Sequence, residues 1–256
     1  MQELTDLAED NVELNFDAVF RRGLYDEDPD VRAGSIRGLW EHEGSDIVDP
    51  LLSLLEMDAS EEVRAEAALS LGRFVLLAEE GNLRESVFER IDAALRRVIE
   101  SASETLEVRR RALESIAAHD SPWVRQAIRE AYEGGVHPMK VSALHAMGRS
   151  CEERWLPLLV REFSSEEAEL RYEAAIACGA VGDARAVPHL ARLARDPDEE
   201  VRKANIFALG EIGGQEARTV LNEVAVSGSK ETRAAALDAL AEMAFDEDPL
   251  SIRNLM

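Results

Sequence analysis

A sequence pattern that recurs every 31 residues constrains the fold of this chain more than any other feature. In residues 169–213 an acid, an apolar residue and an arginine are followed by small residues, glycines and a helix-opening Pro-x-Leu segment. Arg171 and Arg202 open successive copies of this pattern. A fixed period of this length is typical of proteins built from stacked helical hairpins. We therefore expect the 256 residues to form a series of similar units.

The apolar positions of each copy predict two helices. We take the residue before each repeat arginine as position zero; in the fourth copy Met139 is followed by Lys140 instead. The position-zero residues are Val31, Val63, Val108, Met139, Leu170, Val201 and Thr232. Positions zero, +4, +5 and +8 hold apolar or small residues, which lie on one side of a helix, here called helix B. Apolar residues eleven positions earlier mark the preceding helix A: Phe20, Leu52, Ile128, Leu159, Leu190 and Leu221.

One hairpin cannot bury its own apolar faces, so neighbouring hairpins must stack. The predicted fold is an all-α solenoid of about seven hairpins plus a terminal half repeat, wound as a right-handed superhelix. The arginine at +1 lies near the inward side of helix B, and its planar fork can make several hydrogen bonds at once. We predict a structural ladder in which these arginines bind acids or helix-end carbonyls of their own or the next unit: Arg32, Arg64, Arg109, Arg171, Arg202 and Arg233.

The clearest copy of the repeat runs from Glu200 to Gly213 and contains Val201-Arg202, Ala208-Leu209-Gly210 and Ile212-Gly213. This pattern resembles the short HEAT-like repeats first recognised in phycobilin lyases, and the resemblance covers residues 14–256. It implies a solenoid of helical hairpins. Such repeats serve lyases, hydroxylases, glycosylases and plain scaffolds alike, so the resemblance leaves the function open.

Departures from the period predict the domain boundaries. Residues 1–13 are polar and acidic and read as a tail or cap, followed by a single solenoid over residues 14–256. A gap of 45 residues between Val63 and Val108 predicts a lengthened hairpin at about 63–102, with long helices over 63–78 and 83–101. Its tip, with Leu76, Leu77 and Phe88, is a second candidate surface. Residues 249–256 are expected to start an eighth A helix, in which Ile252 caps the core.

Composition narrows the classes of partner. The net charge of −23, from 52 acidic and 29 basic residues, repels phosphate backbones and anionic lipid. No apolar run reaches 18 residues, and Met1–Asp6 lacks the layout of a signal peptide. Cys151 and Cys178 make no disulfide framework. We expect a monomer in the cytoplasm of a prokaryote, with no nucleic-acid or membrane partner.

Three enzyme families have related architectures, and each needs particular residues for its activity. Deoxyhypusine hydroxylases bind iron through His-Glu pairs at the start of B helices, but Tyr172 precedes Glu173 where histidine is needed. Glycosylases of the alkylation-repeat class need a basic groove, and the only basic run here is Arg109-Arg110-Arg111. No residue can be named for phycobilin-lyase activity. The sequence therefore implies no cofactor, no metal and no catalytic residue.

Positions +2, +3, +6 and +10 should point away from the core, toward the concave side that solenoids use for binding. In the middle units this outward stripe mixes cationic, aromatic and apolar residues, the types enriched at binding hot spots. The candidate partner-binding residues are Arg110, Arg111, Glu114, His145, Tyr172, Glu173, Lys203 and Phe207, with Ser142 and Ile176 between them. We predict a non-enzymatic scaffold that binds a protein or peptide on this face. The alternative is a phycobilin-lyase-like subunit that binds a tetrapyrrole chromophore.

Overall fold

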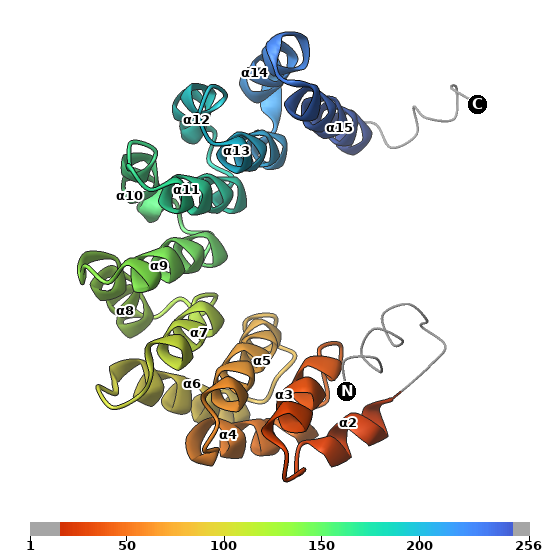
Figure 1. The fold of residues 1–256 in the computed structure, drawn as a ribbon, viewed down its shortest axis with the longest axis vertical. Coiled ribbons are helices and arrows are strands. Elements are labelled where there is room, and N and C mark those ends of the chain that lie inside the picture. Colours follow the sequence, from red (N-terminus) through yellow and green to blue (C-terminus); the bar gives the residue numbers. More distant parts are fainter. Residues whose placement is uncertain (1–15, 248–256) are drawn as a thin grey trace. The chain divides into compact units, whose positions relative to one another are not determined.

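The computed structural model describes residues 16–247, and within that range every regular element is a helix (Figure 1). The predicted all-α class is confirmed. The chain divides into two compact units, residues 1–134 and 135–256. A single right-handed superhelix through both units stays a prediction. The predicted tail over residues 1–13 and the C-terminal half repeat around Ile252 lie outside the described residues.

The first unit contains three hairpins and the helix that follows them. Its elements are α2 (Asp17–Gly23), α3 (Pro29–Gly38), the short 3₁₀ helix η1 (Ser45–Ile47), α4 (Val48–Met57), α5 (Glu61–Glu79), α6 (Glu85–Glu100), α7 (Leu106–Ile116) and α8 (Pro122–Glu133). Helices α3, α5 and α7 are the predicted B helices, and they pack side by side in that order. Each one also packs against the A helix that precedes it in the chain.

The second unit repeats this arrangement. Its elements are α9 (His137–Arg149), η2 (Glu153–Trp155), α10 (Leu156–Glu162), α11 (Ala168–Val181), η3 (Ala184–Ala186), α12 (Val187–Leu193), α13 (Glu199–Ile212), α14 (Gly214–Ser227) and α15 (Lys230–Glu247). The B helices α9, α11, α13 and α15 form one row, and α10, α12 and α14 cover it on one side. Three A helices of the chain are introduced by a short 3₁₀ turn, as in η2 before α10.

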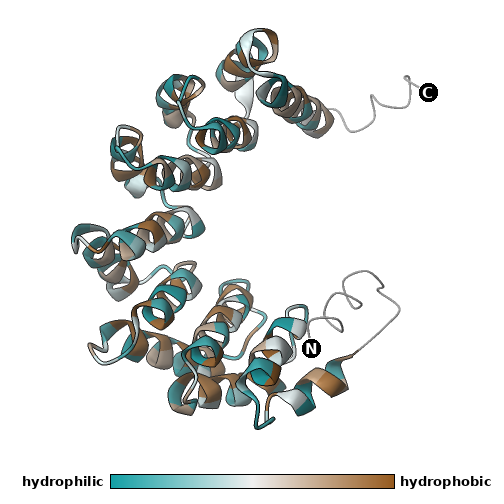
Figure 2. Cartoon of the chain, viewed as in Figure 1, coloured by the Kyte–Doolittle hydropathy of each residue, from teal (hydrophilic) through white to brown (hydrophobic). Residues whose placement is uncertain are grey.

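The periodic apolar positions form the core of both units. All six predicted A-helix markers, from Phe20 to Leu221, are buried. All seven side chains at +4, from Ser35 to Ala236, have no exposed surface. In Figure 2 the apolar residues gather on the sides of the helices that face one another. The helix starts follow from local chemistry, because the side chains of Asp28, Ser60 and Asp198 accept backbone N–H groups of α3, α5 and α13.

Glycines at +9 let adjacent B helices approach closely. A Cβ at Gly179 would lie 2.8 Å from the Cα of Ala208, and one at Gly148 would lie 2.9 Å from the Cα of Ala177. Contacts below 3.0 Å are closer than packed side chains tolerate. The glycine in this column is therefore a packing requirement between successive B helices, not a turn signal.

The lengthened hairpin consists of α5, with 19 residues, and α6, with 16 residues. These bounds agree with the predicted helices to within two residues. At its outer end Leu76 is exposed, whereas Phe88 packs edge-on against the ring of His119 with centroids 4.7 Å apart.

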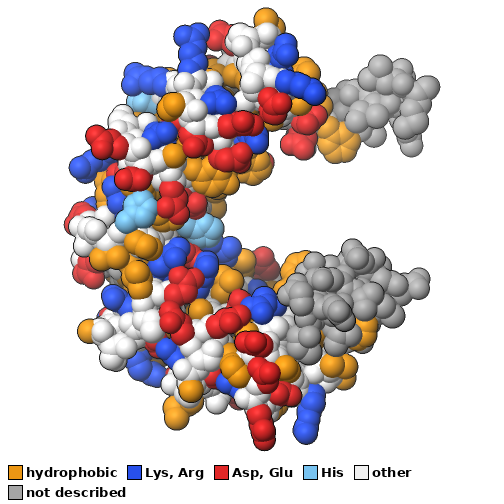
Figure 3. Space-filling model, in the orientation of Figure 1, with side chains coloured by type: hydrophobic (Ala, Val, Ile, Leu, Met, Phe, Trp, Pro, Cys, Tyr) orange, Lys and Arg blue, Asp and Glu red, His pale blue; other side chains and the backbone are white. Residues whose placement is uncertain are grey.

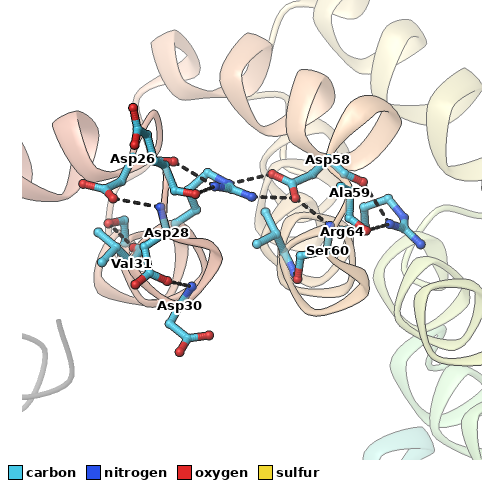
Figure 4. A network of polar contacts seen from close by, with 12 residues as sticks. Asp26, Asp28, Asp30, Val31, Asp58, Ala59, Ser60 and Arg64 are labelled. Atoms are coloured by element: carbon cyan, nitrogen blue, oxygen red, sulfur yellow. Dashed lines mark hydrogen bonds and ion pairs between the residues drawn. The ribbon is translucent and has the colours of Figure 1, made fainter.

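The arginine at +1 ties successive hairpins together (Figure 4). Arg32 donates from Nε and Nη2 to both carboxylate oxygens of Asp58, at 2.7 and 2.8 Å. Its Nη1 donates to the backbone carbonyls of Asp26 and Glu27, at 2.8 and 3.0 Å. One guanidinium therefore fixes the loop before its own helix and the loop of the next hairpin. The predicted ladder includes both kinds of contact, to an acid of the next unit and to backbone carbonyls of the arginine's own unit.

Two further arginines repeat this geometry. Arg171 donates to both oxygens of Asp196 at 2.7 and 2.8 Å and to two carbonyls of the loop before α11. Arg64 pairs in the same way with Glu104, at 3.2 and 2.9 Å. The partner acid stands four or five residues before position zero of the next unit, a spacing that the sequence reading did not specify.

The remaining rungs are weaker. Arg202 donates to the carbonyls of Asp196 and Pro197, and Arg109 donates to that of Ile99. Arg233 departs from the ladder, because its side chain is exposed and makes no hydrogen bond to any described residue. The cause is local: only two residues separate α14 from α15, so no loop carbonyls are presented to it.

Acid should weaken the ladder. Burial disfavours the ionised forms of Asp58 and Asp196, but hydrogen bonds from Arg32, Arg171 and the backbone outweigh it, so the pKa of each carboxyl lies below its usual value. A carboxyl with a depressed folded pKa stabilises the fold above its unfolded pKa of about 4. That contribution is lost as the pH falls through the folded pKa. At pH values below about 4 we expect the urea concentration at the unfolding midpoint to fall, and to fall less steeply for Asp196→Asn than for the wild type. The same dependence of the midpoint on pH in both proteins would contradict this.

Asn205 corrects one prediction. It stands at +4, a core slot that the other copies fill with Ala or Ser, so the sequence predicts a hydrogen bond from its amide to a neighbouring helix end; that prediction is wrong. The side chain is fully buried, and neither its Nδ2 nor its Oδ1 has a hydrogen-bond partner among the described residues. Position +4 lies in the middle of α13 (Glu199–Ile212), away from that helix's own ends.

Replacing Asn205 by alanine is expected to raise the free energy of unfolding by about 1 kcal/mol, because a buried amide without partners is costly. Urea denaturation measures the change. Ala208→Ser, which adds a hydroxyl to a neighbouring buried site of α13, is the opposite-sign control. A loss of stability in Asn205→Ala would mean that the amide is satisfied.

Candidate protein-binding surfaces

The first unit places three predicted residues on α7, held in a cluster of ion pairs. Arg110 donates to Glu107 at 2.8 Å, and Arg111 donates to Glu107 at 2.8 Å and to Glu114 at 3.0 Å. Glu114 is only 7% exposed, although it stands at an outward position, so its side chain is not accessible. The guanidinium groups of Arg110 and Arg111 pair with this carboxylate at 4.0 and 3.0 Å, and their charges compensate for its burial.

A groove of about 500 Å³ runs between α5 and α7 beside this cluster. Its apolar part is formed by Ala65 and by Leu69, whose side chain is 46% exposed. Its polar lining is mostly acidic: Ser60, Glu61, Glu62, Glu66, Glu107 and Arg111. We call this feature the α5/α7 groove.

Most carboxylates of the α5/α7 groove are oriented by arginines. Arg37 of α3 donates to Glu62 at 3.1 Å and to Glu66 at 2.8 Å. Burial lowers the affinity of Arg37 for its proton, but these hydrogen bonds outweigh it and raise its pKa. Glu61 is exposed and pairs with no arginine of the described residues. The groove therefore offers carboxylates held by arginines, and one carboxylate without an arginine partner, around an apolar floor.

The second unit places the other five candidates on three consecutive B helices. His145 lies on α9, Tyr172 and Glu173 on α11, and Lys203 and Phe207 on α13. Phe207 is 52% exposed and Tyr172 is 37% exposed. Figure 3 shows hydrophobic side chains at the surface among acidic ones over α11 and α13. The predicted outward direction therefore holds for these two aromatic side chains.

Ion pairs link the charged members of this second surface. His145 and Glu173 lie 2.9 Å apart through Nδ1 and Oε1. Lys203 lies 2.9 Å from Glu200 and 3.1 Å from Glu199, and the hydrogen bonds that its ammonium donates to these carboxylates raise its pKa. These contacts favour the charged form of Lys203.

Ser142 does not belong to this surface. Its position, +3, is predicted to face outward, but the side chain is fully buried. At +3 the direction depends on the neighbouring helix, and a small residue there allows α11 to pack closely on α9. Ile176 is half-buried, less accessible than Phe207 and more accessible than Ser142.

The sequence reading missed the α5/α7 groove, although a signal for it existed. Leu69 stands at +6, the register that also holds His145 and Phe207, but the outward positions were read only for the middle units. In the second copy, position +6 is Leu69 and the outward position +3 is Glu66, both of which line the groove.

The structure also bears on other chemistry. Among residues 16–247 no group of three His, Cys, Asp or Glu side chains is placed to hold a metal ion. None of the helices in this range has the length and apolarity needed to span a bilayer. Burial raises the pKa of the Cys178 thiol to about 12. Cys151 is exposed and adopts a left-handed φ of 50°, at the repeat position where Gly182 has φ 70°.

A family model described as HEAT repeats matches residues 18–83, 138–204, 156–241 and 192–255, which together exceed half of the chain. The chain belongs to the HEAT-repeat family. The matched segments fall in both compact units and contain the B-helix arginines from Arg32 to Arg233 except Arg109. No curated protein matches.

Solved structures of HEAT-like solenoids share the fold. YibA of Escherichia coli is 19% identical over 94% of this chain and 96% of its own, with a TM-score of 0.55. Kap121p, solved bound to RanGTP, is 15% identical over 91% of this chain and 26% of its own, with a TM-score of 0.57. Human deoxyhypusine hydroxylase is 18% identical over 89% and 84%, with a TM-score of 0.43. At these identities the likeness to YibA and Kap121p establishes the fold alone.

Proposed function

We propose that this HEAT-repeat protein is a non-enzymatic scaffold that binds a protein or peptide partner through its B helices. The observation that carries the proposal is the α5/α7 groove, where exposed Leu69 stands among four glutamates. An accessible apolar side chain inside a rim of charged groups is the usual composition of a protein-binding site. HEAT-repeat solenoids present their B helices as an extended binding surface, and Kap121p was solved with a protein bound.

The charge of the groove indicates the partner's chemistry. Glu61, Glu62, Glu66 and Glu107 face one lining arginine, Arg111. The whole chain carries a net charge of −23, which would steer a basic partner toward it and repel an acidic one. A partner segment with an apolar side chain flanked by lysine or arginine fits the groove. Binding should weaken as the salt concentration rises.

A pull-down with two matched variants tests the proposal. Leu69→Asn removes the apolar floor of the groove without changing charge, and Met57→Asn removes an exposed apolar side chain from the A helix α4 of the same unit. The immobilised proteins are exposed to an extract of the source cells, and retained proteins are identified by mass spectrometry. The affinity of the main retained protein is then measured after purification.

We expect Leu69→Asn to weaken binding of that partner at least tenfold, since a central apolar anchor is worth about 1.4 kcal/mol or more. Met57→Asn should bind like the wild type. Equal affinity of both variants for the partner would show that the α5/α7 groove is not the binding surface.

A further inference from the structure

Trp40 occupies a repeat slot that excludes large side chains. In four other copies position +9 is glycine, at Gly72, Gly148, Gly179 and Gly210, where adjacent B helices approach closely. In the first copy the same position is Trp40, and α3 ends two residues earlier, at Gly38. The indole therefore does not pack between adjacent B helices, and Trp40 is 56% exposed.

The exposed indole lines a pocket of about 560 Å³ within the first unit. Leu76 and Leu77, from the C-terminal part of α5, complete its apolar surface, and Leu76 is itself exposed. Its charged lining consists of Glu41, Glu43, Glu80 and Arg73. We call it the Trp40 pocket; it shares no lining residue with the α5/α7 groove.

Arg73 is a structural part of the Trp40 pocket. Its Nη1 donates to the backbone carbonyl of Trp40 at 2.8 Å, and its guanidinium lies over the ring of Phe74 at 4.9 Å. Its Nε and Nη2 are fully buried and have no partner among the described residues. Burial lowers the pKa of Arg73 to about 10, partly countered by Glu43, so it stays charged at neutral pH.

The accessible charge of the pocket is therefore negative. The Nε and Nη2 donors of Arg73 have no surface to offer a ligand, whereas Glu41, Glu43 and Glu80 are all exposed. An anionic ligand would meet three carboxylates at the rim. A cationic group on an apolar stem would find both an aromatic surface and opposite charges.

We propose that the Trp40 pocket docks a basic amphipathic helix of a partner protein. The helix would place apolar side chains on Trp40, Leu76 and Leu77, and lysines or arginines against Glu41, Glu43 and Glu80. The volume of about 560 Å³ is enough for a few such side chains. Tryptophan is the residue most enriched at the centre of binding sites, and three acids on one rim select the charge of the partner. This surface extends the proposed scaffold function by a second, independent site.

The probe for the test is a synthetic helical peptide with leucines on one face and lysines on the other, blocked at both ends and free of aromatic residues. The control peptide carries glutamate in place of every lysine. Binding is followed by tryptophan emission and by calorimetry on the full-length chain. Trp155 is buried and Trp123 is half-buried with its Nε1 bonded to Asp92, so Trp40 is the exposed reporter among the three.

We expect the lysine peptide to bind with a blue shift of the emission and the glutamate peptide to bind at least tenfold more weakly. Trp40→Phe should remove the blue shift. Because the net charge of −23 attracts any cation, the decisive variant is Leu76→Asn, which leaves the charge unchanged. Leu76→Asn should lower the affinity for the lysine peptide at least tenfold. Leu69→Asn in the α5/α7 groove should leave this affinity unchanged.

Three results would overturn the proposal. The first is an affinity for the lysine peptide that Leu76→Asn does not change, which would reveal attraction by charge alone. The second is tighter binding of the glutamate peptide. The third is a dimer in sedimentation that Leu76→Asn dissociates while neither peptide binds, which would make a second copy the occupant. Because Leu76 is exposed, a thermal melt like that of the wild type will show that the variant is folded.

Discussion

Asp196→Ala is expected to lower the free energy of unfolding by about 3 kcal/mol, because it leaves the buried charge of Arg171 without its carboxylate partner. Asp196 and Arg171 are each 8% exposed, and two hydrogen bonds of 2.7 and 2.8 Å join them. The same carboxylate also accepts the backbone N–H of Asp198 at 2.9 Å, just before α13 begins. The variant therefore loses the bridge between two hairpins and a turn contact at once. Urea denaturation followed by circular dichroism measures the loss.

The matched control is Glu153→Ala in the same unit. It removes an exposed ion pair, in which the Glu153 carboxylate lies 2.7 Å from the guanidinium of Arg185. Exposed pairs contribute less than about 1 kcal/mol, so this variant should unfold close to the wild type. Similar losses in both variants would mean that the ladder is no more than surface charge.

Gly179→Val is expected to lower the free energy of unfolding by about 3 kcal/mol through overpacking between α11 and α13. The Cβ alone would lie 2.8 Å from the Cα of Ala208, where backbone and not a flexible side chain must move. Helix propensity acts in the opposite direction, since valine is a better helix former than glycine by roughly 0.5 kcal/mol. A large loss can therefore be assigned to the contact itself.

Ala180→Val, at the exposed neighbouring position of α11, introduces the same side chain without a helix contact. It should cost about 0.5 kcal/mol, the propensity difference between alanine and valine. If Gly179→Val were as mild as Ala180→Val, the close approach at +9 would not be a packing requirement.

Much of the fold follows from the repeat because a helix has a fixed angular period. Once position zero was placed, Leu159, Ala174 and Leu209 had to fall on buried faces, and they do. The long helices α5 and α6 were also readable, since the apolar pattern continues through Phe74 and Ile91 without a break. These features depend on local spacing, which a single sequence displays directly.

The candidate surfaces depend on contacts between neighbouring units, which the period does not encode. Glu114 is buried because two arginines lie over it, although its slot is exposed in His145 and Phe207. The amide of Asn205 has no hydrogen-bond partner among residues 16–247. The pairing of Arg32 with Asp58 needs a loop of suitable length in the next unit, and the carbonyl contacts need a loop before the arginine's own helix, which Arg233 lacks because only two residues separate α14 from α15. The sequence therefore indicates which face is outward more reliably than which side chain is accessible.

The most direct test of the scaffold account is photo-crosslinking in the source cells. A benzophenone amino acid replaces Leu69 in the α5/α7 groove or, as the matched control, Met57 on α4. The account predicts a discrete adduct with one partner protein from position 69 and not from position 57, with a basic segment of the partner at the crosslink. An absence of any adduct from position 69, or the same adduct from both positions, would contradict it.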